Sequence, residues 1–158
     1  QEADHICVRL VLAGTCWACL SEDTDMFALG CPRVLKGLCL QRSRCILYNW
    51  EEMRASFPIQ QDEFRLVCAA AGTDYGPGIP HLDLQGAWER WREWKAQSHG
   101  IPLLEHMDPS AEFRSVLTVS AEALKPSEDL PPITLGPRNM RRVESYLGRF
   151  GIVFSSPI

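Results

Sequence analysis

The stretch Thr15-Cys-Trp-Ala-Cys-Leu-Ser-Glu-Asp-Thr-Asp25 decides how the fold of this chain is interpreted. Its first six residues, Thr15–Leu20, are mostly apolar and predict a buried strand, and the polar residues 21–25 mark the end of that strand. In an open α/β sheet, ligands bind in the crevice at the carboxyl ends of the strands. Asp23 and Asp25 are therefore predicted to lie in such a crevice.

Two pairs of carboxylates share the same spacing. Asp23 and Asp25 are two residues apart, as are Glu2 and Asp4. This spacing places side chains on one side of an extended backbone but not on one side of a helix, so both pairs are expected at the ends of elements. Carboxylates that lie close together repel one another, and a hard dication such as Mg²⁺ relieves that repulsion. Helix and strand capping explains the same spacing, and the pattern alone leaves both interpretations open.

The order of elements around this stretch predicts an α/β core followed by a helical extension. Helix and strand signals alternate in the first part of the chain, and helices dominate later, apart from a Pro-rich and poorly periodic segment over 98–132. The predicted elements are helices over 1–13, 49–57 (with Asn49 as N-cap), 60–71, 84–97 and 138–149, and strands over 15–20, 33–35, 45–48 and 115–119.

Composition limits the classes of protein to which the chain can belong. With 158 residues, 46% of them hydrophobic and 23% charged, it is expected to form one compact domain or a piece of a larger one. The uncharged run Leu10–Leu20 is too short to cross a membrane, so no membrane partner is expected. The net charge of −4 excludes a protein that binds nucleic acid through a large overall positive charge. A local basic stripe or a bound metal still allows nucleic acid as a partner.

The seven cysteines are expected to be reduced thiols, because their number is odd. Cys16 and Cys19 have the spacing of a redox pair, but they lie in a predicted strand rather than at a helix N-terminus, which favours a structural role. A zinc site is not expected, since no second Cys-x-x-Cys pair occurs in the chain.

Four motifs in order resemble the internal region of the flap endonuclease and XPG-type structure-specific nucleases: Glu2-Ala-Asp4, the turn Ser21–Asp25 with Gly30 and Val34, Gly72-Thr-Asp-Tyr75, and Pro77-Gly-Ile-Pro80. The resemblance covers roughly residues 1–97. It implies an α/β, PIN-like 5′-nuclease fold whose N-terminal part is absent from this chain. Residues 1–75 are then the internal nuclease region, and residues 76–158 a helical C-terminal extension with a degenerate helix–two-turn–helix.

The same resemblance implies a function and a site. The function is that of a metal-dependent endonuclease or 5′-exonuclease hydrolysing phosphodiester bonds, with two Mg²⁺ ions for which Mn²⁺ can substitute. One ion activates a water molecule and the other stabilises the leaving oxygen. The residues implied as metal ligands or their immediate partners, and hence as catalytic residues, are Glu2, Asp4, Asp23, Asp25 and Asp74. Glu22, inside the same turn, is expected to face away.

The chain departs from the family pattern after residue 80. His81 and Asp83 stand where the family has two glycines whose backbone amides approach duplex phosphates, and Gln85 replaces a basic residue. The added charge and side chains place duplex DNA binding in doubt. The virion host-shutoff ribonucleases of herpesviruses also lack this hairpin but keep the carboxylates, so an RNA endonuclease is the alternative within the class.

The resemblance also calls for two further aspartates and a basic helical arch, and no counterpart occurs in this sequence. The chain is therefore expected either to be part of a longer protein or to be a catalytically inactive remnant that serves as a nucleic-acid or protein interaction module. Expected partners are branched DNA or RNA and the upstream half of the same nuclease fold. The expected location is intracellular, either the nucleus or, for a viral protein, the infected cell.

Overall fold

The computed structural model describes residues 3–97, 100–126 and 139–149. The helices are α1 (Ala3–Leu12), α2 (Asp25–Leu29), α3 (Trp50–Ser56), α4 (Gln61–Ala71), α5 (Leu84–Gln97), α6 (Leu103–Met107), α7 (Arg114–Ala123) and α8 (Met140–Gly148). The strands are β1 (Cys19–Leu20), β2 (Arg33–Cys39) and β3 (Arg44–Asn49), with a 3₁₀ turn η1 (Leu40–Arg42) between β2 and β3. Within the described ranges, no helix is long and apolar enough to span a membrane.

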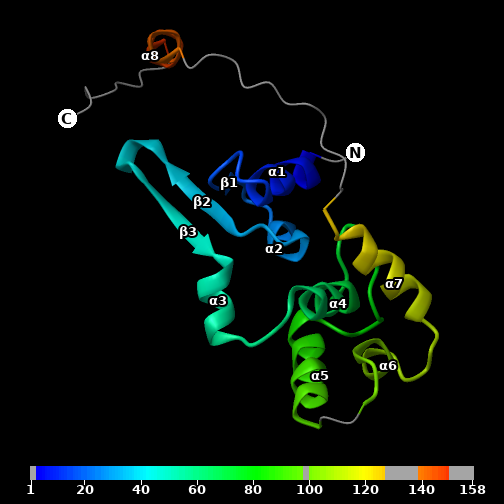
Figure 1. The fold of residues 1–158 in the computed structure, drawn as a ribbon. Helices are drawn as coiled ribbons and strands as arrows, with labels where there is room; N and C mark the ends of the chain where they lie inside the picture. The colour runs from blue at the N-terminus through cyan, green and yellow to red at the C-terminus, as the bar shows by residue number, and fades with distance from the viewer. Residues whose placement is uncertain (1–2, 98–99, 127–138, 150–158) are drawn as a thin grey trace.

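The three strands form one sheet in the order β1-β2-β3, with β1 parallel to β2 and β3 antiparallel to it. Figure 1 shows the tip of the β2–β3 hairpin on the opposite side of the molecule from α4, α5, α6 and α7. Because side chains alternate between the faces of a sheet, one row of partners faces the helices and the next row faces outward. The inner row is Cys19, Val34 and Tyr48, and the outer row is Leu20, Leu35 and Leu47. Leu20 is 54% exposed and Leu47 45% exposed, so the outer row leaves an apolar face uncovered by the described residues.

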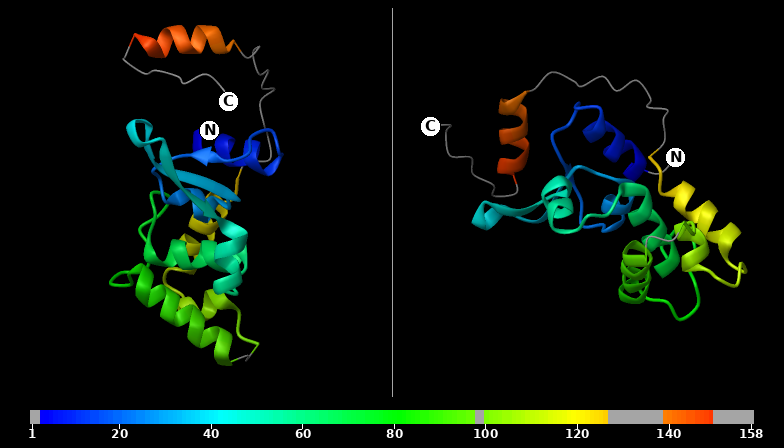
Figure 2. Two further views of the ribbon diagram at one scale, coloured as in Figure 1. Left: turned by 90° about the vertical axis from the view of Figure 1, so that its left-hand side faces the viewer. Right: turned by 60° about the horizontal axis from the view of Figure 1, so that its bottom comes forward.

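Two large hydrophobic clusters make up most of the core. The first joins α1, α2 and the inner face of the sheet through Val8, Val11, Met26, Leu29 and Val34. The second lies among α4, α5, α6 and α7, which gather at the end of the molecule away from the hairpin (Figure 2), and also includes Trp50. The Phe27 side chain packs against both clusters and so connects the sheet with the helical part. The division of the chain at residues 75 and 76 stays a prediction.

Several helix boundaries follow directly from the sequence. Asn49 is the N-cap of α3, since its side-chain oxygen accepts a hydrogen bond from the Glu51 amide at 3.2 Å, as predicted. At the start of α4, Gln60 and Glu63 form a capping box. Helix α5 has the predicted bounds, and α8 lies inside the predicted range 138–149.

The prediction of a strand over Thr15–Leu20 was wrong for most of its length. Only Cys19 and Leu20 pair with β2. The Cys16 amide donates instead to the carbonyl of Leu10 in α1 at 3.0 Å, and the Trp17 carbonyl accepts from Arg33 Nε at 2.6 Å. Backbone groups used in this way cannot form a strand ladder, and the Trp17 side chain is 62% exposed. Being two residues long, β1 gives the sheet a very short edge strand.

The predicted strand over 115–119 was also wrong, because these residues belong to α7. The β-branched residues in Val-Leu-Thr-Val suggested a strand. Leu117, Ser120 and Leu124 are nevertheless buried at intervals of three and four residues, which is the spacing of one helix face. Burial against α4 thus overrides the local preference for extended backbone.

The cysteines are all free, in agreement with the expectation of reduced thiols. Cys19 and Cys31 are buried in the first cluster. Cys45 is exposed on β3.

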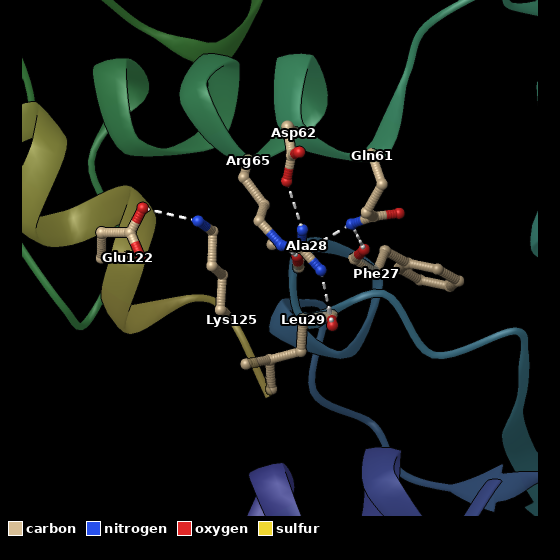
Figure 3. Close-up of polar contacts among 8 residues, drawn as sticks. All are labelled: Phe27, Ala28, Leu29, Gln61, Asp62, Arg65, Glu122 and Lys125. Atoms are coloured by element: carbon tan, nitrogen blue, oxygen red, sulfur yellow. Dashed lines mark hydrogen bonds and ion pairs between the residues drawn. The ribbon is translucent and has the colours of Figure 1, made fainter. Parts of the chain in front are cut away.

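Helix α4 holds the C-terminus of α2 through two polar side chains (Figure 3). Gln61 Nε2 donates to the carbonyls of Phe27 and Ala28, at 3.0 and 2.9 Å. Arg65 donates through Nε to the Ala28 carbonyl at 3.2 Å and through its terminal nitrogen to the Leu29 carbonyl at 3.3 Å. Carbonyls at a helix C-terminus have no partner within the helix, so these contacts satisfy them and fix the position of α2.

Candidate functional site

Asp4 lies half-buried in the first turn of α1, where the helix dipole favours a negative charge. Its charge acts at the start of β1: the pKa of the Cys19 thiol is raised to about 12, mainly by burial and then by the thiols of Cys7 and Cys31, with a smaller contribution from Asp4. Asp4 is therefore close to the strand that leads into the acidic turn. Glu2, the other carboxylate of this pair, lies outside the described residues.

The turn Ser21–Asp25 is built from side chains that bind the backbone two residues later. Ser21 Oγ accepts from the Asp23 amide at 3.0 Å, and Asp23 Oδ1 accepts from the Asp25 amide at 2.8 Å. Asp25 then begins α2. Glu22 Oε1 accepts from the Gly37 amide of β2 at 2.7 Å, so its side chain is engaged at the hairpin. Asp23, one position before the N-cap Thr24, thus satisfies the first amide of α2 as a capping side chain does, and one oxygen of its carboxylate is not needed for this bond.

Asp25 lines a cavity of about 770 Å³ between α2, α3, α4 and α5. The walls are largely aromatic and aliphatic, and Asp25 and Thr73 belong to the polar part of the lining. The charge of Asp25 reaches Cys68 on α4: burial raises the pKa of that thiol to about 12, and Asp25 adds to the effect. Asp25 and Thr73, the neighbour of Asp74, thus line the same cavity.

Asp74 is exposed in a tight turn that follows α4. The amide and carbonyl of Thr73 exchange hydrogen bonds with those of Gly76, at 2.9 and 3.0 Å, and Thr73 Oγ1 accepts from the Tyr75 amide at 3.2 Å. The Tyr75 hydroxyl lies 3.2 Å from His5 Nε2 of α1. The turn that carries Asp74 thus meets the helix that carries Asp4.

Gly72 and Gly78 allow the loop after α4 to fold back closely on that helix. The Ile79 amide donates to the Ala70 carbonyl at 2.8 Å. A Cβ atom at Gly78 would lie 2.5 Å from the Gly72 nitrogen and 2.7 Å from the Ala70 carbonyl oxygen, and the φ of Gly78 is +69°. Only glycine fits this backbone, which in turn fixes where Asp74 is presented.

The described carboxylates are suited to hard cations, since all of them offer oxygen. In the part of the chain that the structure describes, no Lys or Arg lies within salt-bridge distance of Asp4, Asp23 or Asp74. The ranges 3–97, 100–126 and 139–149 hold no group of three or more His, Cys, Asp or Glu side chains that is close enough to bind a metal by itself. The predicted ligand set, in which Glu2 is not described, therefore stays a prediction.

Three further residues contribute to this region without having been predicted. His5 and Tyr75 link two carboxylate-bearing segments, and Ser120 of α7 donates from Oγ to the Tyr75 carbonyl at 3.4 Å. Tyr75 was part of a motif, but nothing in the sequence indicated a partner 70 residues away. Nothing in the sequence indicated Ser120 either, because it follows the predicted strand over 115–119 in a segment without clear periodicity.

The two positions after Pro80 that depart from the family pattern have distinct local roles. His81 has a φ of +64°, a left-handed conformation that favours glycine. Asp83 caps α5: its Oδ1 accepts from the Gly86 amide at 2.8 Å. The backbone at His81 therefore keeps a glycine-like shape, and the Asp83 carboxylate stabilises a helix N-terminus.

Comparison with known proteins adds independent evidence. Residues 1–74 match the family model of the XPG I-region. Flap endonuclease 1 of Leishmania major is 30% identical over 92 residues, which cover 56% of this chain and 23% of that protein. The chain spans about a quarter to a third of the length of such relatives, since the coverage of the flap endonuclease 1 proteins of Leishmania braziliensis and Trypanosoma cruzi is 29% and 32%.

Solved structures show the same fold. Flap endonuclease-1 from Methanococcus jannaschii superposes with a TM-score of 0.62 at 20% identity, over 95% of this chain and 45% of that one. The catalytic core of Rad2 in complex with DNA substrate also gives a TM-score of 0.62, at 14% identity, over 94% of this chain and 56% of that one. Over residues 1–74, and in the partial α/β, PIN-like fold that it shares with these nuclease cores, the chain is similar to the flap endonuclease and XPG-type nucleases.

Proposed function

We propose that this chain supplies the metal-ligand carboxylates of a flap endonuclease-like nuclease, which hydrolyses phosphodiester bonds in nucleic acid. One observation supports the proposal: three separate segments that carry these carboxylates meet one another. The turn before Tyr75 contacts the first turn of α1, which carries Asp4, through the contact with His5. Asp25 and Thr73, the neighbour of Asp74, line the same cavity.

Two divalent ions, Mg²⁺ with Mn²⁺ as a substitute, are the proposed cofactors. When bound, such ions polarise a phosphoryl oxygen and lower the pKa of a coordinated water. The proposed ligands or their immediate partners are Glu2, Asp4, Asp23, Asp25 and Asp74. The proposed contribution of the protein is to bring these carboxylates to one site despite their mutual repulsion. The bond from Asp23 to the start of α2, the α1 N-terminus and the tight loop after α4 fix the backbone of the segments that carry Asp4, Asp23, Asp25 and Asp74.

The altered loop bears on the substrate. With Asp83 as the cap of α5 and a side chain on His81, a duplex phosphate meets negative charge and less accessible backbone than two glycines offer. This favours, as a second candidate, cleavage of RNA over cleavage of branched duplex DNA. His81→Gly combined with Asp83→Gly is expected to strengthen duplex binding, while glycine still serves as a helix cap at a loss of a few tenths of a kcal/mol.

The proposed nuclease needs the rest of its fold. The outer row Leu20, Leu35 and Leu47 and the unpaired side of β1 in the described sheet offer an apolar face and a strand edge for an upstream half of the same nuclease fold. That half is supplied either in the same polypeptide or as a second chain.

The test uses the 158-residue chain with and without that upstream half. At a Mn²⁺ concentration of ten times Kd, binding to the native state is expected to add about 1.4 kcal/mol of stability and to raise the melting temperature by about 3–5 °C. The Asp23→Asn and Asp25→Asn double variant should lose this shift, and the loss is not expected to come from the cap, because asparagine is also a good N-cap. Glu93→Gln, at an exposed position of α5, is the matched control.

Cleavage of flap DNA and single-stranded RNA is then followed in the reconstituted protein. Mg²⁺-dependent cleavage that is lost in Asp25→Asn supports the proposal. A Mn²⁺ shift without cleavage by the reconstituted protein would identify the chain as an inactive interaction module. A melting temperature that does not respond to Mn²⁺ would refute the metal site.

A further inference from the structure

A contact between distant segments lies beside the candidate carboxylates. His5 Nε2 and the Tyr75 hydroxyl are 3.2 Å apart, and their rings meet edge to face with centroids 5.8 Å apart at an interplanar angle of 82°. The two residues are separated by 70 positions in the chain. One hydrogen bond and one ring contact thus join the first turn of α1 to the turn after α4.

The orientation of Tyr75 is fixed from its other side as well. Its amide donates to Thr73 Oγ1, and its carbonyl accepts from Ser120 Oγ of α7. Ser120 is buried, and Gly76 is packed so closely against it that a Cβ atom at Gly76 would clash with the hydroxyl. The turn therefore rests on α7 and presents the Tyr75 ring toward α1.

We propose that His5 and Tyr75 are positioning residues that hold Asp4 and Asp74 toward a common divalent cation. The inference rests on the proposed function. Asp4 directly precedes His5, and Asp74 directly precedes Tyr75, so the contact brings together the backbones that carry the two carboxylates. Two carboxylates that bind one cation repel each other when the cation is absent, and the His5–Tyr75 contact would oppose their separation.

This role predicts a specific effect on cation affinity. Residues that orient metal ligands without touching the metal change its affinity by about 10–100-fold when mutated. Removing the Tyr75 hydroxyl or the His5 ring should weaken Mn²⁺ binding by about tenfold, the lower end of that range. Because both changes break the same contact, the double variant should bind Mn²⁺ little worse than either single variant.

The experiment measures Mn²⁺ binding to the full chain by electron paramagnetic resonance of the free ion, at a temperature at which every variant is folded by circular dichroism. The variants are His5→Ala, Tyr75→Phe, their combination, and His5→Gln, which keeps a group able to hydrogen-bond the tyrosine hydroxyl. The controls are His106→Ala on α6 and Tyr48→Phe on β3, which make the same chemical changes elsewhere. Asp74→Asn reports the loss of a proposed ligand.

Weaker binding in His5→Ala and Tyr75→Phe, without additivity and with recovery in His5→Gln, supports the inference. If wild type binds Mn²⁺ and Asp74→Asn does not, while His5→Ala and Tyr75→Phe match the controls, the positioning role is wrong and the proposed function stands. If wild type binds no Mn²⁺, both fall. Should His5→Ala fail to fold, Tyr75→Phe decides the matter, because it removes only one oxygen atom.

Discussion

Arg65 is expected to be a main support of α2, the helix that begins with Asp25. Its side chain is 12% exposed and donates to the carbonyls of Ala28 and Leu29 and to Asp62 Oδ1 (Figure 3). The change Arg65→Met keeps the apolar stem and removes all of these bonds. The two helix carbonyls differ in what they retain: Ala28 still accepts from Gln61, whereas the Arg65 bond to Leu29 is lost without replacement.

The magnitude follows from these contacts. A hydrogen bond from a charged group contributes about 1.5–3 kcal/mol, and the exposed pair with Asp62, whose side chain is 79% exposed, contributes about 0–1 kcal/mol. One bond lost fully and one compensated in part predict a loss of about 2–3 kcal/mol for Arg65→Met. For a chain of this size, that corresponds to a fall in melting temperature of about 5–10 °C.

Urea unfolding monitored by tryptophan fluorescence is the assay, with the slope m checked for constancy between variants. Asp62→Asn is the matched control, since it breaks the ion pair and leaves the bonds from Arg65 to α2 in place. It should cost less than 1 kcal/mol. Equal losses in Arg65→Met and Asp62→Asn would show that the bonds to α2 contribute nothing and that the reasoning is wrong.

Two further predictions concern the loop after α4 and the cap of that helix. Gly78→Ala should destabilise the chain by about 3 kcal/mol or more in the same unfolding assay, because a Cβ atom there meets backbone atoms at 2.5–2.8 Å. The control is Gly14→Ala, at a similar φ of +71° with nothing within 4 Å, which should cost only about 1–2 kcal/mol. Similar losses for both variants would contradict the packing argument. Burial raises the pKa of Glu63, but hydrogen bonds from Lys95, the Gln60 amide and Trp91 bring it below the ordinary 4.5. The stabilising effect of the ionised Glu63 carboxylate is therefore complete above pH 4.5 and is lost as the pH falls through the folded-state pKa. The Glu63→Gln variant should accordingly lose less stability than wild type between pH 6 and 3. Parallel plots of unfolding free energy against pH for the two proteins would refute this.

The fold was predictable from the sequence wherever a local signal and tertiary packing agreed. The Asn49 cap, the α4 start and the whole of α5 are such cases, because caps and amphipathic periodicity act within a few residues. The strand prediction was wrong for the residues before β1, because their backbone groups bind α1 and the Arg33 side chain. No local sequence pattern encodes these contacts. The prediction for the α7 segment was wrong because its β-branched residues favour a strand. The burial of Leu117 and Ser120 on one face stabilises a helix there instead.

In the candidate site, too, local motifs were recognisable in the sequence and long-range contacts were not. The order of the motifs was the basis for proposing Glu2, Asp4, Asp23, Asp25 and Asp74 as one set, which stays a prediction. The residues that bring the segments together, His5 and Ser120, could not be identified, since each acts through one long-range contact. The sequence predicts that Asp83 places negative charge where a phosphate would dock. It does not predict that the same carboxylate caps the N-terminus of α5.

The uneven exposure of the cysteines gives the protein a natural attachment point for a fluorescent dye. Maleimides react with the thiolate form, and the pKa values of Cys19 and Cys68 near 12 leave almost no thiolate at neutral pH. Cys45 is exposed on β3, so one equivalent of dye should label the hairpin first. The unmodified sequence can then be followed by fluorescence anisotropy with nucleic acid or with an upstream polypeptide, without an engineered cysteine.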